Sequence, residues 1–326
     1  MLDDASTKGG DGEVNPAASI VVPTRGGAKR LPVLLRALSL QDTDDFEVVV
    51  VVDGDIDGTA RLLDSWSDRL PLRTIVFPEN LGRSAALNAG ADLASGEILI
   101  RSDDDLEPGF GFVRGHIAHH SHATGPIGVV GLTTNHYPDT PFARAYGRAA
   151  DRRFIRDALR LPEHSTWRLW AANVSVSKII HRNLGGYDSR YRRYGWEDVD
   201  FGYRLHAAGV RVVVAPDLMA IHHGASTTTA VRTVRALHSG SARETFVGIH
   251  GTQALPEPSA GGGAWGLIVG AGARFATTRT LRAYGAAVDT IAPFVPIKLA
   301  EKLIALGVES AGLAGAQRPE RASEDF

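Results

Sequence analysis

Phe46-Glu47-Val48-Val49-Val50-Val51-Val52 is a nearly unbroken run of aromatic and β-branched residues, and it decides the fold class. A run without polar alternation is typical of a parallel strand that is buried on both faces. The turn Asp53-Gly54-Asp55-Ile56-Asp57-Gly58-Thr59 follows directly. Its Asp and Thr residues predict the N-terminal cap of a helix that runs to about Trp66.

The same alternation of strand and helix signals continues on both sides of this run. Strands are predicted at 19–23, 72–77 and 97–101, and helices at 31–40 and 84–94. Alternating strands and helices with short connections indicate an α/β fold, with a mostly parallel sheet and helices on both faces. Ligands bind such sheets at the carboxyl ends of the strands. Thr24, Asp53 and Asp103 lie at those ends, so we expect the functional site there.

Composition and charge exclude several classes of protein. The chain has 326 residues, of which 44% are hydrophobic and 22% are charged, and its formal net charge is −2. This composition is ordinary for a globular α/β protein and gives no signal for a nucleic-acid partner. The absence of cysteine excludes disulfides and thiolate chemistry. No apolar run is long enough for a membrane span and none marks a signal peptide. We therefore expect a cytoplasmic protein, or one peripheral at the inner face of a membrane.

The chain divides into five predicted parts. Residues 1–16 are polar and are expected to form a disordered tail, followed by an α/β domain at 17–255. Within this domain, the last clear strand is predicted at 210–215. Residues 256–263 are rich in Gly, Pro, Ser and Ala and are interpreted as a linker. Residues 264–314 predict an appendage of two or three amphipathic helices, and residues 315–326 a second disordered tail.

Two clusters of acidic residues need a partner that offsets their charge. Asp103-Asp104-Asp105 follows the strand at 97–101, and Trp196-Glu197-Asp198-Val199-Asp200 opens a helix. Like charges packed closely repel one another, and a divalent cation with oxygen ligands would offset them. The alternatives are an acidic turn on the surface for the first cluster and a helix N-terminal acid pair for the second.

The order of motifs resembles the family 2 glycosyltransferases, enzymes of the Rossmann-like GT-A fold. The likeness covers roughly residues 17–230. Its motifs are Ser19–Thr24, Val52–Thr59, Glu79–Arg83 with Asn88–Gly90, Gly96–Leu99 leading to the three aspartates, Gly185–Asp188 and Trp196–Asp200. Two departures stand out. Val52 replaces an acid that the family often has, and Arg101-Ser102 replaces an apolar pair.

The resemblance implies a binding site for a nucleotide-diphosphate sugar of the UDP, GDP or dTDP type. Asp53 would accept a hydrogen bond from the base, with Thr24 and Arg25 lining the same edge. Asp53 could instead be a helix cap, although Asp57 is the better candidate for that role. Arg83 would contact the diphosphate or base, or else pair with a surface carboxylate.

The metal site is also implied by the resemblance. Asp103 would meet the ribose or a metal-bound water, and Asp105 would ligate Mg²⁺ or Mn²⁺ that bridges the diphosphate. Asp104 is expected to be a structural partner beside this pair in the nucleotide site. His222 would complete the metal site, since a neutral imidazole is a suitable ligand beside carboxylates. The histidines at 116, 119, 120 and 122 have no place in the family pattern, and we interpret them as a solvated helix face.

The second acidic cluster supplies the predicted catalytic residues. Asp198 is the candidate general base that takes a proton from the acceptor hydroxyl. Glu197 would raise the pKa of Asp198 toward a useful value. Trp196 would give the sugar or acceptor an apolar platform, and its alternative role is ordinary core packing.

The region 142–193 is rich in arginine, with Arg148, Arg152 and Arg156 at i, i+4 spacing on a predicted helix. Such a helix suits phosphates or an anionic membrane surface. Together with the amphipathic helices at 264–314, it indicates a lipid-linked acceptor at a bilayer. The alternative is a solvated helix plus a homo-oligomer contact through the C-terminal helices.

The leading hypothesis is an inverting, metal-dependent glycosyltransferase of the hexosyltransferase class. Its acceptor would be a glycan or a lipid-linked hydroxyl in cell-envelope polysaccharide synthesis. The alternatives are a retaining glycosyltransferase or a sugar-1-phosphate nucleotidyltransferase on a similar fold. A catalytically silent sugar-nucleotide-binding protein is the non-enzyme alternative.

Overall fold

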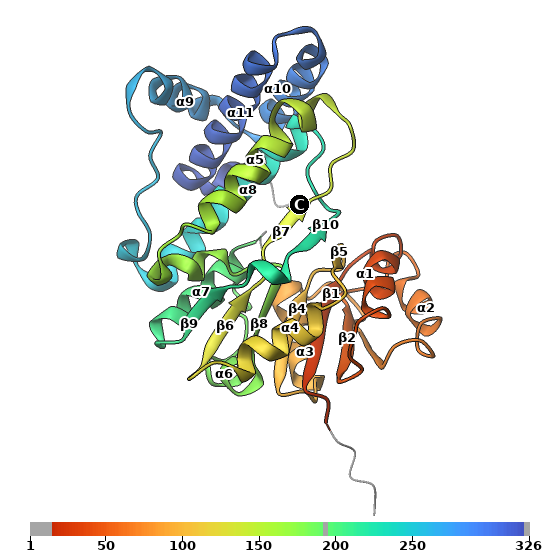
Figure 1. Cartoon of the computed structure of the whole chain (residues 1–326). Coiled ribbons are helices and arrows are strands. Elements are labelled where there is room, and N and C mark those ends of the chain that lie inside the picture. Colours follow the sequence, from red (N-terminus) through yellow and green to blue (C-terminus); the bar gives the residue numbers. More distant parts are fainter. Residues whose placement is uncertain (1–14, 192–194, 323–326) are drawn as a thin grey trace, which may run out of the picture.

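Seven strands form the central sheet of the computed structural model, which describes residues 15–191 and 195–322 (Figure 1). They are β1 (Ala18–Thr24), β2 (Phe46–Val52), β3 (Leu72–Val76), β4 (Ile98–Ser102), β6 (Ile127–Val130), β8 (Asn173–Ser177) and β9 (Arg211–Val214), in the spatial order β3-β2-β1-β4-β8-β6-β9. Strand β8 runs antiparallel to β4 and β6, and the other neighbouring pairs are parallel. The predicted mostly parallel sheet is confirmed.

Helices cover both faces of this sheet, as the valine run predicts. Val48, Val50 and Val52 pack on one face with α1 (Leu31–Leu38), α2 (Thr59–Asp64) and α4 (Phe112–Ser121). Val49 and Val51 point to the other face, into the core formed with α3 (Arg83–Leu93), α6 (Lys178–Asn183) and α7 (Trp196–Ala207). Successive side chains of a strand alternate between faces, so an all-apolar strand requires a core on each side.

A second, three-stranded sheet lies beside the carboxyl edge of the first. It has the order β5-β10-β7, with β5 (Leu106–Pro108), β10 (Ala220–His222) and β7 (Thr133–Asn135). Strand β10 follows the strand at 211–214, so the predicted last strand is followed by one more. This small sheet matters for the site because β10 carries His222 and pairs with β5 directly after the three aspartates.

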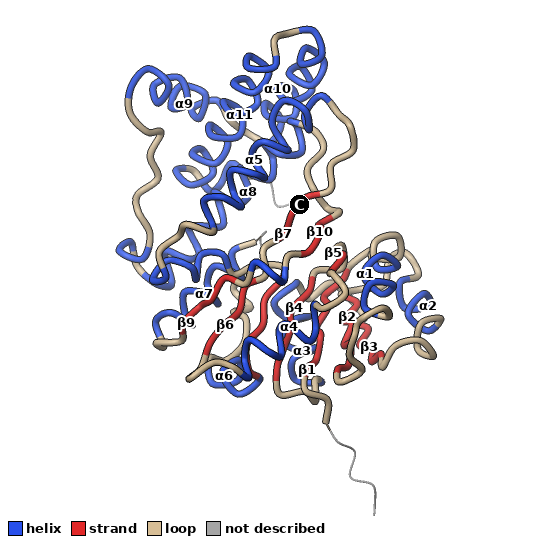
Figure 2. Tube along the Cα trace, in the orientation of Figure 1, coloured by secondary structure: helices blue, strands red, loops and turns tan. Residues whose placement is uncertain are grey.

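The remaining helices gather on one side of the sheets (Figure 2). They are α5 (Arg148–Ala158), α8 (Thr229–His250), α9 (Gly263–Phe275), α10 (Thr278–Ile291) and α11 (Ile297–Gln317), and a π-helix at Ala143–Gly147 precedes α5. Single turns of 3₁₀-type helix occur at Pro216–Leu218, Thr252–Ala254, Ala292–Phe294 and Pro319–Arg321, and a longer one at Glu163–Leu169. None of the described helices is both long and apolar enough to cross a bilayer.

The helices α8 and α11 pack closely because glycine occupies their contact. A Cβ at Gly315 would collide with the carbonyl oxygen of Leu237, and one at Gly240 would collide with that of Gly312. Leu237, Val269, Leu281 and Ala314 then form one core from α8, α9, α10 and α11. Helix α8, which lies inside the predicted α/β domain at 17–255, therefore packs with the C-terminal helices.

Two expectations from the sequence differ from the structure. His116 is fully buried, with Nδ1 2.8 Å from Ser175 Oγ and Nε2 3.1 Å from Asn173 Oδ1. The histidine helix is therefore not a solvated face at this position, and burial lowers the pKa of His116 to about 3. The chain is also helical through Gln317 and again at Pro319–Arg321, where disorder was expected. Residues 1–14 and 323–326 of the predicted tails lie outside the described residues.

Candidate active site

A cleft of about 440 Å³ lies at the carboxyl ends of β1, β2 and β4. All the predicted site residues line it except Asp198 and Trp196: Thr24, Arg25, Asp53, Arg83, Asp103, Asp104, Asp105, Glu197 and His222. The parallel strands bring the first seven together because their carboxyl ends share one edge of the sheet. Helix α7 and strand β10 add Glu197 and His222 from the other side. The structure thus assembles one polar cleft from segments far apart in the sequence.

Arg101 is a buried cation between the two acidic clusters. Its side chain is only 4% exposed, Nη2 donates to Asp103 Oδ1 at 3.0 Å, and Nη1 pairs with Asp198 Oδ1. Nη1 also donates to the carbonyl of Ala171 at 3.1 Å. Burial alone would raise the pKa of Asp103, but the charges of Arg101 and Arg83 outweigh it and hold that pKa below its usual value. The departure from the family pattern at Arg101 therefore supplies a counter-charge for both clusters.

Asp104 is held against the first strand by Arg30, a residue that the sequence reading did not select. Asp104 Oδ2 accepts from Thr24 Oγ1 at 2.5 Å and from Arg30 Nη2 at 2.7 Å, and Oδ1 accepts from Arg30 Nε at 3.0 Å. Burial raises the pKa of Asp104, and the bonds to Arg30 and Thr24 oppose that rise. The expected structural role of Asp104 agrees with these contacts. In the sequence, Arg30 is marked only by the basic residues near it after Thr24, Arg25 and Lys29.

Asp53 holds the loop that enters α3. Its Oδ1 accepts from the backbone N–H of Leu81 at 2.6 Å, and its Oδ2 accepts from that of Gly82 at 3.0 Å. Asp57, in contrast, accepts from Thr59 Oγ1 at 2.5 Å at the start of α2. The residue that caps α2 is Asp55, whose Oδ1 accepts from the backbone N–H groups of Gly58 at 3.0 Å and Thr59 at 2.9 Å, so the expectation that Asp57 is the helix cap is wrong. Asp53 fixes the loop that leads to Arg83. Contact between Asp53 and a base stays a prediction.

Asp105, His222 and Gly224 form the part of the cleft that fits a divalent cation. Asp105 Oδ1 is buried and has no hydrogen-bond partner, and its Oδ2 lies 3.4 Å from His222 Nε2. A Cβ on Gly224 would collide with Asp105 Oδ2 and lie 2.9 Å from His222 Nε2, so glycine leaves this space open. Burial alone would lower the pKa of His222, but the hydrogen bond and charge of Asp105 raise it.

These side chains do not enclose a cation by themselves. Within residues 15–191 and 195–322, no group of three or more His, Cys, Asp or Glu side chains is arranged to hold a metal alone. Hard cations such as Mg²⁺ bind through one or two carboxylates and take further oxygens from water and substrate phosphates. The orphaned oxygen of Asp105 and the open space over Gly224 fit a cation of that kind.

Glu197 and Asp198 occupy different environments at the start of α7. Glu197 lines the cleft, and its Oε1 lies 3.4 Å from Arg83 Nη1. Asp198 does not line the cleft and pairs with Arg101. Its side chain is nevertheless 10% exposed, compared with 3% for the side chain of Glu197. Trp196 packs against Phe246 of α8, with ring centroids 5.4 Å apart, and donates from Nε1 to the carbonyl of Ser239. These contacts agree with the alternative role of Trp196 in core packing, and they give no support to its predicted role as a platform for the sugar or acceptor.

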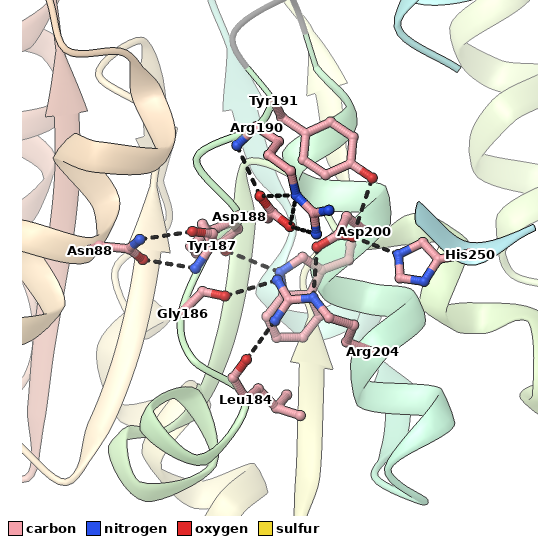
Figure 3. Close-up of polar contacts among 11 residues, drawn as sticks. Asn88, Leu184, Gly186, Tyr187, Asp188, Arg190, Tyr191, Asp200, Arg204 and His250 are labelled. Atoms are coloured by element: carbon pink, nitrogen blue, oxygen red, sulfur yellow. Dashed lines mark hydrogen bonds and ion pairs between the residues drawn. The ribbon is translucent and has the colours of Figure 1, made fainter. Parts of the chain in front are cut away.

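A polar network centred on Asp200 holds the segment before α7 (Figure 3). The fully buried Asp200 accepts from Arg204 at 2.7 Å and from the hydroxyl of Tyr191 at 3.2 Å, and it lies 2.6 Å from His250 Nε2. Tyr191 lines the cleft, so this network ties one cleft wall to α8. Sequence reading placed Asp200 in the motif but had no signal for Tyr191 or His250.

Position 186, in the motif before α7, requires glycine for two reasons. Its φ is +70°, and a Cβ there would collide with Asn88 Oδ1. Asn88 instead accepts from the backbone N–H of Tyr187 at 2.7 Å and donates to its carbonyl at 2.8 Å. This pair of bonds joins the predicted Asn88–Gly90 and Gly185–Asp188 motifs (Figure 3).

The sheet order and the acidic edge agree with the predicted GT-A fold. Residues 19–177 match the model described as "Glycosyl transferase family 2", and residues 158–227 match "N-terminal domain of galactosyltransferase". The first match spans just under half of the chain and agrees with the resemblance to the family 2 glycosyltransferases seen in the sequence.

Curated relatives carry related names. Validoxylamine A glucosyltransferase of Streptomyces hygroscopicus subsp. jinggangensis (strain 5008) is 32% identical over 61% of this chain and 54% of the relative. Uncharacterized glycosyltransferase YfnE of Bacillus subtilis (strain 168) is 29% identical over 63% of this chain and 64% of the relative. The chain spans about half the length of the Streptomyces relative and under two thirds of the Bacillus one.

Solved structures share the fold. Mannosyltransferase PcManGT from Pyrobaculum calidifontis, in complex with GDP-Man and Mn²⁺, has a TM-score of 0.56 at 20% identity and covers 94% of this chain and 89% of its own. S. aureus TarS 1-349 in complex with UDP-GlcNAc has a TM-score of 0.51 at 14% identity, with 93% and 92% covered. At these identities the likeness shows the fold alone, and it confirms the predicted GT-A class.

Proposed function

We propose that the chain transfers a sugar from a nucleotide-diphosphate sugar to an acceptor hydroxyl, with inversion at the anomeric carbon and with Mg²⁺ or Mn²⁺. The observation that carries the proposal is the convergence of two acidic clusters on one cleft, with a histidine and an orphaned carboxylate oxygen on one wall. Relatives named as glycosyltransferases and structural neighbours with GDP-Man or UDP-GlcNAc support this donor class.

Different residues of the site would bind the cation, bind the nucleotide and act as the base. Asp105, Asp103 and His222 would hold the cation, which when bound acts as a Lewis acid on the departing nucleoside diphosphate. Thr24, Arg25 and Arg83 line the space for the nucleotide. Asp198 is the proposed base. Arg101 holds its Oδ1, and its other oxygen would take the acceptor proton as that hydroxyl attacks opposite the leaving group.

The first test is calorimetric titration of UDP, GDP and dTDP, each with and without Mn²⁺. We expect one nucleotide to bind in a metal-dependent way, and Asp105→Asn to lower that affinity at least about 10-fold because it replaces a charged ligand. Asp217→Asn is the matched control, since Asp217 is exposed and outside the cleft.

Failure of every nucleotide to bind the wild type would mean that the family fold here carries no donor site. Metal-independent binding, unchanged in Asp105→Asn, would instead favour an enzyme or binding protein without the proposed cation. A sugar-1-phosphate nucleotidyltransferase would be recognised by consumption of a nucleoside triphosphate with a sugar phosphate. A retaining transferase would be recognised by the anomeric configuration of the product.

The acceptor is proposed to be presented at an anionic lipid surface. Around the turn between α10 and α11, Ile291, Phe294, Ile297 and Leu299 are exposed, Phe294 by 86%. Lys298 and Lys302 are exposed beside them. Exposed apolar side chains with neighbouring cations match the chemistry of an anionic bilayer. The row of arginines predicted on α5 contributes less to this lipid-facing surface, because Arg148 pairs with Asp139 and Arg156 pairs with Asp157.

Sedimentation with phosphatidylserine-containing vesicles tests this surface. We expect the wild type to bind them and to bind pure phosphatidylcholine vesicles weakly, because each Lys or Arg near an anionic surface contributes about 1 kcal/mol. Phe294→Ser combined with Ile297→Ser should abolish binding. Phe110→Ser is the control, since Phe110 is 68% exposed elsewhere. A concentration-dependent dimer that the double variant disrupts, without vesicle binding, would assign the surface to a second copy of the chain.

A further inference from the structure

A chain of three hydrogen-bonded side chains leads from α5 to the cation-binding wall of the cleft. Asp151 on α5 bonds to Asn135 on β7, Asn135 bonds to His222 on β10, and His222 faces Asp105. Neither Asn135 nor Asp151 lines the cleft. Asn135 contacts His222 at Nδ1, the ring nitrogen opposite the one that faces Asp105. Asn135 can therefore affect the cleft only through His222.

The backbone of the small sheet brings these residues together. Strands β7 and β10 run parallel with Asn135 and His222 in register, and the N–H of His136 donates to the carbonyl of His222 at 2.9 Å. On the other side, β10 pairs with β5, and the N–H of His223 donates to the carbonyl of Asp105 at 2.9 Å. His222 is therefore fixed between its amide partner and its acidic neighbour by backbone bonds on both sides.

Chemistry determines the direction of each bond in the chain. Asp151 Oδ2 accepts from the backbone N–H of Asn135 at 3.1 Å, and Oδ1 lies 2.5 Å from Asn135 Nδ2. An ionised carboxylate only accepts, so the NH₂ group of Asn135 must face Asp151. The amide oxygen of Asn135 then faces His222 Nδ1 at 2.7 Å, and an amide oxygen can only accept. The proton of a neutral His222 must therefore lie on Nδ1.

In the neutral ring, the other nitrogen of His222, Nε2, then carries the lone pair and faces Asp105. Nε2 lies 3.4 Å from Asp105 Oδ2, and the missing side chain of Gly224 keeps the space beside both atoms open. Ligating histidines bind metals through a nitrogen without a proton, and the opposite N–H is usually held by an acceptor.

We propose that Asp151 and Asn135 are positioning residues that set the tautomer of His222, so that Nε2 is available to a divalent cation shared with Asp105. The inference rests on the proposed function, because it gives that cation its imidazole ligand. It adds two residues outside the cleft, each acting through the next. Asp151 sets the orientation of the Asn135 amide, and Asn135 sets the ring nitrogen that His222 offers.

The test is nitrogen-15 NMR of the His222 ring in the full chain without metal, at a pH well above the pKa of His222. His222→Gln identifies the signals. We expect the wild type to carry its proton on Nδ1, and Asn135→Ala and Asp151→Asn to move a measurable fraction to Nε2. Mn²⁺ alone, titrated by electron paramagnetic resonance, should bind about 10- to 100-fold more weakly to both variants. Asp157→Asn is the matched control, since Asp157 is exposed on the same helix.

The outcomes separate this inference from the proposed function. A wild-type proton on Nε2, or an unchanged tautomer in both folded variants, would overturn the inference. So would a shifted tautomer with unchanged Mn²⁺ affinity. If the tautomer shifts as expected but the wild type binds no Mn²⁺, the hydrogen-bond chain stands and the metal part of the proposed function fails. Asp151→Asn preserves side-chain size, so it gives a readout even if Asn135→Ala does not fold.

Discussion

Replacing Asp198 with asparagine is expected to lower turnover by about 10²- to 10⁴-fold, the usual contribution of a general base, while nucleotide affinity stays near the wild-type value. The reason is that asparagine keeps the size of the side chain beside Arg101, but it cannot take the acceptor proton. The measurement is the initial rate of sugar transfer under saturating donor, together with calorimetric titration of the nucleotide.

Glu197→Gln is the matched variant for this prediction. Glu197 lines the cleft but its side chain is only 3% exposed and lies beside Arg83, so we expect a smaller loss of turnover. The opposite ranking, with Glu197→Gln nearly inactive and Asp198→Asn active, would move the base to Glu197. Full activity in both variants would remove general-base catalysis by this acid pair from the mechanism.

Replacing Arg101 with methionine is expected to lower the free energy of unfolding by about 3–5 kcal/mol. Removing one partner of a buried pair leaves an uncompensated charge, and Arg101 is the partner of both Asp103 and Asp198. Methionine fills much of the same volume, so the loss reports the charge more than a cavity. The measurement is urea unfolding followed by tryptophan fluorescence.

Arg156→Met is the control for Arg101→Met. Arg156 pairs with Asp157 on the surface, with its side chain 53% exposed, and this change should cost less than about 1 kcal/mol. An equally small loss in Arg101→Met would show that the acidic clusters do not depend on this counter-charge. Because Arg101 also holds the proposed base, we expect Arg101→Met to lose turnover even at temperatures where it stays folded.

The acidic edge of the sheet was accessible from the sequence because each residue there belongs to a local pattern. Asp53 and Asp103 follow apolar runs, and the carboxyl ends of parallel strands necessarily meet. Arg30, Tyr191 and His250 had no such pattern. The partners of Arg30 and His250, Asp104 and Asp200, lie in distant segments, so only the packed chain shows these contacts.

Burial was the other point that local patterns could not settle. The spacing of the histidines on α4 looked like a polar face, yet His116 is buried against Ser175 and Asn173 of β8. A buried neutral imidazole is acceptable where both nitrogens have partners, and those partners come from another strand. The same limit applies to Trp196, whose neighbour Phe246 lies on a different helix.

The sequence by itself determined the alternation of strands and helices, the parallel sheet and the family resemblance, because apolar periodicity and short motifs are local properties of the chain. The tertiary structure alone decided which distant polar side chains meet: Arg101 with Asp198, and His222 with Asp105 and Asn135. Charge pairing depends on distances of a few ångströms between segments far apart in the chain, and these are set only when the sheets and helices pack.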